Sequence, residues 1–452
     1  MLRARVAPTF SFTRTLTSTP VVAAAVRQKD GKKKQVMRKK IDPNAVKVVK
    51  TTALTHLPFV EAVRNLGLEK NAPASNTSEL SFAELKSGKI TSYPADIEAK
   101  LKIVGGFRRH QHHEMYDKPI SMVTTNTERL TGFIDKLNEP SKDNRVYLDG
   151  IKGCGKSTLL NQAITLANEK FNGDIIVMHL DAGESVANGT SDYIKNNKLK
   201  MYQQPMLTKR WIWKILKTNE KIFKKHQIEM KAGKNTLFEY LKQNHEFGKP
   251  LPHSSFQFFI EELVAHSKDI PVLLSIDNFN AFADTTLTKY RHPDFTLIPV
   301  AEFEVGDFIL KVASGDLSFT KGGALFAKSN NFSEKKKTTQ VAIYPEEPYD
   351  PYMKLPQFDF EIANRLTRHG GIKPFKVDPL TKDEVKSLMT FWRQQGVLLV
   401  RQDFHKKIFD EEVAAKILQV DPDSQFEKLV ESSYIMNQGN PHMMVKQAMM
   451  SY

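Results

Sequence analysis

One octapeptide dominates the sequence, at residues 150–157, and it reads Gly150-Ile151-Lys152-Gly153-Cys154-Gly155-Lys156-Ser157. It fits the pattern G-x-x-x-x-G-K-[ST] at every position. Glycines let successive backbone N–H groups curl around phosphate oxygens, which a Cβ would obstruct. The lysine supplies a positive charge to the β- and γ-phosphates, and the serine hydroxyl is a Mg²⁺ ligand. The pattern predicts a loop that binds nucleotide phosphates.

The flanking residues give this loop the context that it requires. Residues 146–148 form a short β-prone run, and the apolar residues after the loop recur at helical spacing. A strand, a glycine-rich loop and a helix are thus predicted in that order. The helix would point the positive end of its dipole at the same phosphates. We add Thr158 to the eight motif residues as a nucleotide-binding residue, because its hydroxyl can donate to the α-phosphate.

A second strand should carry a carboxylate on the Mg²⁺ side of such a site. The apolar run 271–276 predicts a buried parallel strand, and Asp277 stands at its C-terminal end. The predicted metal residues are therefore Ser157 and Asp277. The next residue is Asn278, whose amide can orient water but cannot accept its proton at neutral pH. This favours slow hydrolysis, although Asp284 could supply a base from the same loop.

Further apolar runs predict strands at 175–180, 323–327 and 375–377, with helices between them around 207–227, 256–267 and 298–314. Strands that alternate with helices indicate an α/β fold with a mostly parallel sheet covered on both faces. Ser329 and Asn330 follow the strand at 323–327, in the position of a phosphate-sensing polar residue. Residues 381–450 read as helices only, and they begin with the capping box Thr381–Glu384. Helices are predicted from there to Gly396 and near 403–418, 424–436 and 441–450.

Composition excludes several classes of protein. The chain has 452 residues and a single Cys, which excludes a disulfide scaffold and a Cys-ligated zinc site. No apolar run approaches the roughly 20 residues that a membrane helix needs. The cluster of Arg and His at 108–113 has no repeated spacing, so we predict no metal site there.

The net charge of +15 is concentrated at the N-terminus. Residues 1–50 hold 13 Lys or Arg and two acids, a net of +11, which leaves +4 for the other 402 residues. Residues 1–29 contain no acid and are rich in Arg, Ser and Thr, which is typical of a mitochondrial transit peptide. The alternative is a basic tail of a cytosolic or nuclear protein.

The basic run that follows predicts an RNA-binding arm, with a merely solvated tail as the alternative. Its candidate RNA-binding residues are Lys32, Lys33, Lys34, Arg38, Lys39 and Lys40. We divide the chain into a transit peptide at 1–27 and a basic, partly extended arm at 28–118. A nucleotide-binding domain at 119–378 and a helical C-terminal domain at 379–452 follow.

From about residue 80 onward the chain resembles a known family, that of the mitochondrial small-ribosomal-subunit protein S29, also called death-associated protein three. The resemblance rests on Tyr147–Ser157, Gln204-Pro205 ahead of a helix, Ile276–Ala281, Pro379–Gly396 and Gly439-Asn440-Pro441. It implies an AAA-like P-loop fold with a helical lid. It also implies a purine nucleotide with Mg²⁺, GTP or GDP, with ATP as the alternative because no Asn-Lys-x-Asp motif is present.

The resemblance implies particular residues and partners as well. The base would lie near Met122, Val123 and Thr124. His442 stands where related ATPases often hold an Arg that senses the γ-phosphate. The candidate phosphate-sensing residues are therefore Asn278, Ser329 and His442. The implied partners are small-subunit rRNA and neighbouring proteins of the small-subunit head, and a contact with the large subunit is allowed. The implied location is the mitochondrial matrix, with no membrane insertion.

Together these features favour a structural ribosomal protein that retains a nucleotide with slow or absent hydrolysis. The rival interpretation is an active mitochondrial P-loop ATPase or GTPase that acts as an assembly factor or a signalling switch. A DNA-loading ATPase shares the fold and the charge, but no recognition helix stands out in the sequence.

Overall fold

The computed structural model describes residues 77–450 with short gaps, the longest of them at 229–235, 246–254 and 399–421. The predicted transit peptide, the six candidate RNA-binding residues and the predicted helix at 403–418 therefore lie outside the described residues.

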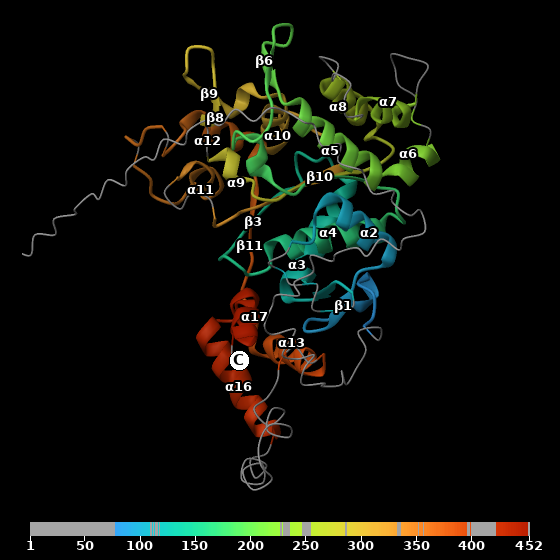
Figure 1. Ribbon diagram of the computed structural model, residues 1–452, viewed down its shortest axis with the longest axis vertical. Helices are drawn as coiled ribbons and strands as arrows, with labels where there is room; N and C mark the ends of the chain where they lie inside the picture. The colour runs from blue at the N-terminus through green and yellow to red at the C-terminus, as the bar shows by residue number, and fades with distance from the viewer. Residues whose placement is uncertain are drawn as a thin grey trace, which may run out of the picture. The chain divides into compact units, whose positions relative to one another are not determined.

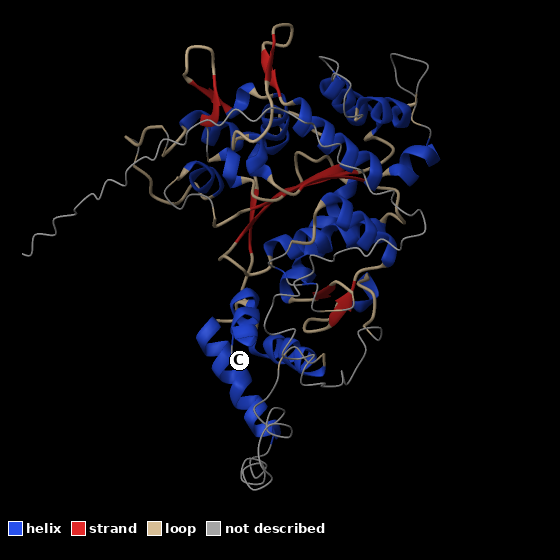
Figure 2. Ribbon diagram, in the orientation of Figure 1, coloured by secondary structure: helices blue, strands red, loops and turns tan. Residues whose placement is uncertain are grey.

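A parallel sheet forms the centre of the described part of the chain (Figure 2). Its strands follow the order β11-β3-β10-β7-β4. Their bounds are β3 (Arg145–Asp149), β4 (Ile176–Leu180), β7 (Val272–Ile276), β10 (Gly322–Ala327) and β11 (Lys373–Lys376). The strand before the glycine-rich loop and the strand before Asp277 are not neighbours, because β10 lies between them and pairs with both. The predicted α/β fold with a parallel sheet is confirmed.

Helices cover both faces of this sheet (Figure 1). Successive strand residues point to opposite faces, so Tyr147 packs into one core and its neighbours Val146 and Leu148 into the other. The first core includes residues of α5 (Pro205–Thr218), α8 (Ser255–His266) and α10 (Glu304–Ser314). The second includes residues of α2 (Ala95–Val104), α3 (Thr125–Asp135) and α4 (Lys156–Lys170). Burial on both faces explains why the inner strands are continuous apolar runs.

Shorter elements surround this frame. The helices are α6 (Glu220–His226), α7 (Leu237–Asn244), α9 (Asn280–Ala283), α11 (Thr338–Ile343) and α12 (Phe360–Leu366). Three two-stranded sheets are β1 (Ile90–Ser92) with β2 (Ile120–Met122), β5 (Ile194–Asn196) with β6 (Met201–Gln203), and β8 (Leu287–Arg291) with β9 (Leu297–Pro299). The 3₁₀ helices are Phe82–Glu84, Lys136–Asn138, Gly183–Val186, Val300–Glu302 and Arg368–Gly370.

The C-terminal helices are α13 (Lys382–Gln394), α16 (Pro422–Asn437) and α17 (Pro441–Met450). They share a core of their own, which includes Trp392, Phe426 and Met444. Side chains of β1 and β2 pack against that core. The predicted capping box is present, since the Thr381 hydroxyl accepts from the Glu384 N–H and the Glu384 carboxylate accepts from the Thr381 N–H.

Two predicted helices differ from the structure. The helix expected at 207–227 is broken at Asn219 into α5 and α6, because the Asn219 side chain pairs with both backbone groups of Val177 on β4, each at 2.8 Å. The helix expected at 298–314 begins only at Glu304. Its first residues form β9 and a 3₁₀ turn instead, since this places Ile298 in a small core with aromatic side chains.

A search of the described helices for a membrane-spanning segment found none that is both long enough and apolar enough.

Candidate nucleotide-binding site

The glycine-rich loop, residues 150–155, joins the end of β3 to the first residue of α4. Gly153 and Gly155 have φ values of 86° and 101°, in the left-handed region that glycine enters without strain. At Gly153 space is also limiting, because a Cβ would lie 2.6 Å from the Cβ of His442. The first residues of α4, Lys156, Ser157 and Thr158, line the cavity that this loop borders.

Lys156 folds back over the loop that precedes it. Its Nζ donates to the carbonyl oxygens of Gly150 and Ile151, each at 2.7 Å, and to Oδ1 of Asn330 at 3.1 Å. Burial lowers the pKa of the Lys156 ammonium, and the nearby Cys154 and Asp149 oppose that effect. Neutral carbonyls and an amide are weak partners for a buried cation, so an anionic phosphate would satisfy this ammonium better.

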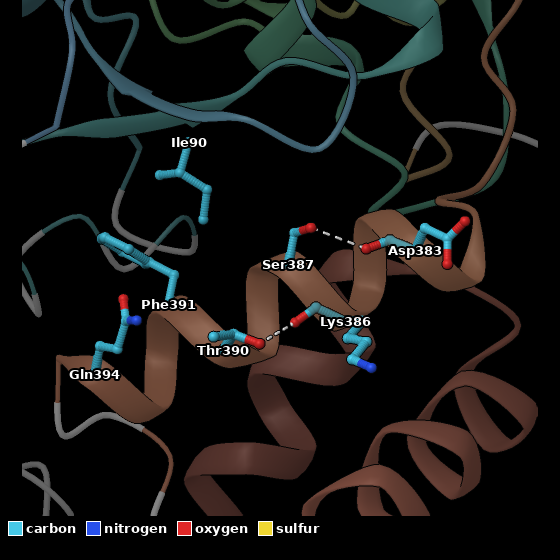
Figure 3. A pocket seen from close by; sticks show the side chains of 7 residues that line it. All are labelled: Ile90, Asp383, Lys386, Ser387, Thr390, Phe391 and Gln394. Carbon is cyan, nitrogen blue, oxygen red and sulfur yellow. Dashed lines mark hydrogen bonds between the residues drawn. The ribbon is translucent and has the colours of Figure 1, made fainter.

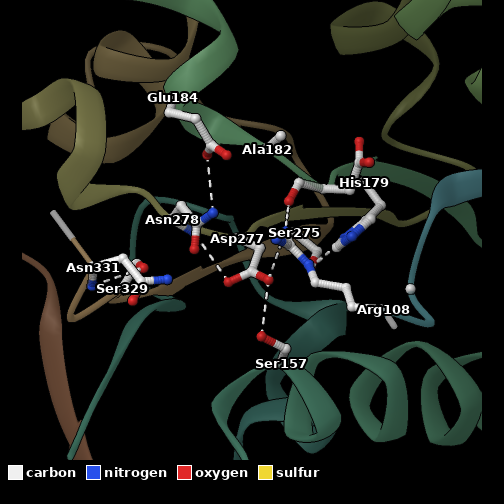
Figure 4. A network of polar contacts seen from close by, with 12 residues as sticks. Arg108, Ser157, His179, Ala182, Glu184, Ser275, Asp277, Asn278, Ser329 and Asn331 are labelled. Carbon is white, nitrogen blue, oxygen red and sulfur yellow. Dashed lines mark hydrogen bonds and ion pairs between the residues drawn. The ribbon is translucent and has the colours of Figure 1, made fainter. Parts of the chain in front are cut away.

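Ser157 and Asp277 meet although 120 residues separate them. The Ser157 hydroxyl donates to Oδ2 of Asp277 at 2.8 Å, as Figure 4 shows. Nη2 of Arg108 lies 3.0 Å from the same oxygen. A hydroxyl beside a carboxylate at the edge of a phosphate-binding loop is the pair that holds Mg²⁺ and its waters. Among the described residues, no group of three His, Cys, Asp or Glu could hold a metal, so waters and, with nucleotide bound, phosphate oxygens would complete the coordination.

The polar side chains that follow Asp277 form hydrogen bonds with other protein groups. Asn278 has a φ of 59°, and its Nδ2 donates to Oε2 of Glu184 at 2.9 Å. Asn280 exchanges two hydrogen bonds of 2.8 Å with the backbone of Ser329. This exchange joins the ends of β7 and β10, so Asn278 and Ser329 lie together at the cavity (Figure 4).

Asp284 lies away from the phosphate loop. It lines a separate, smaller cavity of about 140 Å³, where it accepts from the N–H and the hydroxyl of Thr339, each at 2.7 Å. Burial raises the pKa of Asp284 to about 6, and the hydrogen bonds from Thr339 oppose that rise. Among the described residues that line the main cavity, Asp277 is the only carboxylate.

The C-terminal helices touch the glycine-rich loop directly. Nδ2 of Asn440 donates to the carbonyl of Lys152 at 2.7 Å, and the N–H of His442 lies 3.4 Å from the carbonyl of Gly153. Oδ1 of Asn440 also accepts from His442 N–H, at the start of α17. The loop is therefore held on one side by the sheet and on the other by α17.

These elements enclose a cavity of about 700 Å³. The predicted residues that line it are Met122, Thr124, Lys152, Gly153, Cys154, Gly155, Lys156, Ser157, Thr158, Asp277, Asn278, Ser329 and His442. Three predicted residues do not line it. Gly150 packs beneath the loop, Ile151 is 49% exposed, and Val123 is buried, with its backbone bonded to Lys89 and Gly88.

One end of the cavity is polar and the other is apolar. The apolar end is formed by Leu380, Leu388, Trp392 and Val445, beside Met122. A site with phosphate-binding groups at one end and hydrophobic side chains at the other suits a nucleotide, whose charged phosphates and flat base differ in the same way.

A second hollow, of about 480 Å³, lies between Ile90 and α13 (Figure 3). Two of its hydroxyls are used within the helix, because Ser387 donates to the Asp383 carbonyl at 3.0 Å and Thr390 to the Lys386 carbonyl at 2.7 Å. Its lining has no residue of the glycine-rich loop. We therefore place the candidate site in the main cavity.

Sequence reasoning missed several residues of the cavity. Arg108 and Trp392 carry no motif, and they come from distant parts of the chain. Asn330, which the sequence places with Ser329 after the strand at 323–327, lines the cavity as well. A signal existed for Arg108 alone, since a Gly-Gly pair precedes it and marks a tight approach of the backbone.

Comparison with known proteins gives the family. A model of the family described as mitochondrial ribosomal death-associated protein 3 matches residues 121–447. The chain belongs to this family. The small ribosomal subunit protein mS29 of Schizosaccharomyces pombe is 26% identical over 396 residues, covering 83% of this chain and 80% of that protein. The protein of the same name from Neurospora crassa is 22% identical over 343 residues, covering 70% and 69%.

Among solved structures, a chain of an E. coli HORMA:CdnC:Trip13 complex aligns with 80% of this chain and 93% of its own, at 10% identity and a TM-score of 0.29. That score is too low to relate the two folds. The family match confirms the resemblance seen in the sequence, and with it the predicted location at the mitochondrial ribosome in the matrix.

Proposed function

We propose that this protein is a structural constituent of the mitochondrial small ribosomal subunit that retains a purine nucleotide within its fold. The nucleotide is GTP or GDP with Mg²⁺, and ATP is the alternative. The two curated relatives are both small ribosomal subunit proteins, which supports the ribosomal role. The protein would contact small-subunit rRNA and neighbouring ribosomal proteins of the head, and a contact with the large subunit remains allowed.

One observation carries the nucleotide part of the proposal. The glycine-rich loop is bonded to α17 through Asn440, while Lys156 and Asp277 face the same cavity from the sheet side. A nucleotide there would touch the P-loop domain and the helical lid together. Its binding energy would add to the stability of the native state, by about 2.7 kcal/mol when the free ligand is at 100 times its dissociation constant.

Each residue has a role in holding the nucleotide. Lys156 would exchange its carbonyl partners for β- and γ-phosphate oxygens, and backbone N–H groups of the loop would bind the remaining oxygens. Ser157 and Asp277 would hold Mg²⁺, which neutralises phosphate charge. The apolar end of the cavity would take the base.

The same residues favour slow hydrolysis. Asn278 cannot accept a proton from water, and its amide already binds Glu184. Asp284 opens onto a different cavity. His442, when neutral, lacks the fixed positive charge with which an Arg stabilises the transition state.

An active NTPase is the second candidate function, because the Glu184 carboxylate accepts a hydrogen bond from the Asn278 amide. A carboxylate there could orient water through the amide or, after a small movement, accept its proton. As an enzyme, the protein would act as an assembly factor or a signalling switch.

A nucleotide assay of the full chain distinguishes the two. The purified protein is denatured, the released nucleotide is identified, and the turnover of GTP and ATP with Mg²⁺ is measured. We expect retained nucleotide and turnover below about 0.001 per second. Turnover near 1 per second would support the enzyme instead.

The matched variants are Lys156→Ala and Lys170→Ala, which remove one lysine from opposite ends of α4. Only Lys156→Ala should lower the affinity for nucleotide, by at least roughly tenfold, because it removes a buried charge-assisted contact to phosphate. Equal retention in both variants would contradict the site.

A further inference from the structure

Arg108 contacts the metal side of the cavity although it belongs to no motif (Figure 4). Its Nη2 lies 3.0 Å from Oδ2 of Asp277 and also donates to the carbonyl of Asp181. The Asp277 side chain is 6% exposed, so the ion pair is largely shielded from water. The same Asp277 oxygen accepts from the Ser157 hydroxyl.

The backbone holds Arg108 in this place. Gly105 has a φ of 86°, and a Cβ there would lie 2.7 Å from Oδ2 of Asp181. The carbonyl of Gly106 accepts from Nδ2 of Asn161 at 2.8 Å. Two glycines thus let the chain pass close to Asp181, just after the end of β4, and to Asn161 of α4, and Arg108 follows two residues later.

The charges around Arg108 leave Asp277 as its carboxylate partner. The Asp181 carboxylate is already paired with Nζ of Lys214 at 2.6 Å, and Asp149 is paired with Nζ of Lys328 at 2.9 Å. Neither of these two carboxylates lines the cavity, and among the described residues that do, Asp277 alone has a carboxylate. One carboxylate therefore faces both the guanidinium and the predicted metal position.

We propose that Arg108 is a tethered cation that competes with Mg²⁺ for Asp277, so that metal and guanidinium occupy this carboxylate in turn. The inference rests on the proposed nucleotide site and describes its regulation. A divalent ion held by Ser157 and Asp277 would stand within a few ångströms of a guanidinium bonded to the same oxygen, and two cations at that distance repel. Binding of the metal must move the Arg108 side chain.

Two consequences follow for nucleotide binding. Without metal, the ion pair already neutralises Asp277, so a negative phosphate meets less repulsion from it. With metal, part of the metal's binding energy is used to displace Arg108. The affinity for nucleotide should therefore depend less on Mg²⁺ than it would if Arg108 were absent.

The test is a metal titration of the full chain and of Arg108→Gln. Mn²⁺, a paramagnetic substitute for Mg²⁺, is titrated into protein freed of nucleotide, and bound ion is measured by magnetic resonance. GDP affinity is then measured against Mg²⁺ concentration. We expect Arg108→Gln to bind Mn²⁺ more tightly, and to reach half of the Mg²⁺ effect on GDP at a lower concentration, each by roughly threefold to tenfold.

The matched control is Lys446→Gln. Lys446 lines the same cavity from α17 and is exposed, so this variant removes an equal charge without touching Asp277. Its Mn²⁺ affinity should change less than that of Arg108→Gln. A third variant, Arg108→Lys, keeps the charge but replaces the planar guanidinium by a shorter side chain with a compact ammonium, and it should lie between the wild type and Arg108→Gln.

The outcomes separate this inference from the proposed function. Tighter Mn²⁺ binding in Arg108→Gln, but not in Lys446→Gln, supports competition between Arg108 and the metal. If none of the proteins binds GDP, the proposed nucleotide site is wrong, but the competition for Asp277 still stands. An equal gain in Mn²⁺ affinity in Lys446→Gln would mean that the effect comes from the net charge of the cavity rather than from Arg108, and it would overturn the inference. Unchanged or weaker Mn²⁺ binding in a folded Arg108→Gln protein would also overturn it. Weaker GDP binding without any change in Mn²⁺ affinity would make Arg108 a phosphate ligand and overturn it as well.

Discussion

Lys156 and Asp277 show how single charged residues are satisfied within the proposed phosphate site. The ammonium of Lys156 binds two carbonyls and an amide, and the carboxylate of Asp277 binds a hydroxyl and a guanidinium. Each charge has a partner within the fold, and each partner could be exchanged for a nucleotide or a metal. The residues are thus held close to the geometry that they would need when bound.

Gly439 should be the most sensitive glycine at the junction with the C-terminal helices. Its φ is 69°, and a Cβ would collide with the carbonyl oxygen of Leu380. Gly370 is the matched control, because its φ is 82° and nothing lies within 4 Å of its Cβ position. We expect Gly370→Ala to lower the free energy of unfolding by ~1 kcal/mol, and Gly439→Ala by a further ~1–3 kcal/mol. Equal losses in urea unfolding would contradict the collision.

Asp284 should give stability a measurable pH dependence. Its folded pKa of about 6 lies above the ordinary value of 3.8, so the folded state favours the protonated carboxyl. That contribution is fully present below pH 3.8 and is lost as the pH rises through about 6. Compared with Asp284→Asn, the wild type should therefore lose up to roughly 3 kcal/mol of unfolding free energy between pH 4 and pH 7. A constant difference between the two proteins across this range would refute the assignment.

Residue identities at the phosphate side could be predicted from sequence, because the glycines, Lys156 and Ser157 serve one function at fixed spacing. The pairing of Ser157 with Asp277 also followed from the rule that parallel strands end at one edge of the sheet. Arg108 and Trp392 could not be predicted, since their place depends on how distant segments pack rather than on local pattern.

At the scale of elements, Glu384 joins the C-terminal helices to the rest of the protein. It is 2% exposed, and its Oε1 accepts from the Ser87 hydroxyl at 2.7 Å and from the Thr125 N–H at 3.0 Å. Its Oε2 accepts from the Thr381 N–H at 2.7 Å, which completes the capping box of α13. One carboxylate thus binds the starts of both α3 and α13.

Glu384→Ala should therefore destabilise more than the loss of a helix cap. Three donors lose their acceptor, and we expect the free energy of unfolding to fall by about 2–4 kcal/mol. Glu384→Gln keeps one acceptor oxygen and should lose less. Thermal and urea unfolding would measure both, and a loss of less than about 1 kcal/mol in Glu384→Ala, the size of a cap alone, would show that the link to α3 contributes little.

The sequence predicted most elements around the site but not their limits. The strands at β4, β7 and β10 and the helices α8, α16 and α17 agree with the predicted ranges to within two residues. The helix at 207–227 was wrong because a side chain, Asn219, binds a strand that the local pattern does not include. The capping box at Thr381 was right because it is a local interaction.

At the scale of the whole molecule, the position of β10 between β3 and β7 separates the phosphate loop from the strand of Asp277. No local pattern encodes that order, so sequence predicted a parallel sheet and left its order open. The contact of α17 with the loop is likewise tertiary, and no local pattern specifies which residues make it. This contact is what would make a bound nucleotide part of the structure.

The basic arm gives a prediction about RNA. Its six candidate residues lie outside the described residues, so the expectation rests on charge alone. Replacing Lys32, Lys33, Lys34, Arg38, Lys39 and Lys40 by Ala should make the affinity for single-stranded RNA less dependent on salt, lowering the slope of log affinity against log salt by about 4. An unchanged slope would mean that the arm does not bind phosphates.

The central claim, a ribosomal constituent that needs no turnover, is tested most directly by sedimentation. Mitochondrial lysate is centrifuged through sucrose at moderate salt with Mg²⁺, and again after chelation separates the ribosomal subunits. We expect the protein to migrate with the small subunit in both gradients, and a folded Lys156→Ala variant to migrate there too. Migration as a free protein or a small oligomer, under conditions that keep the small subunit intact, would contradict the claim.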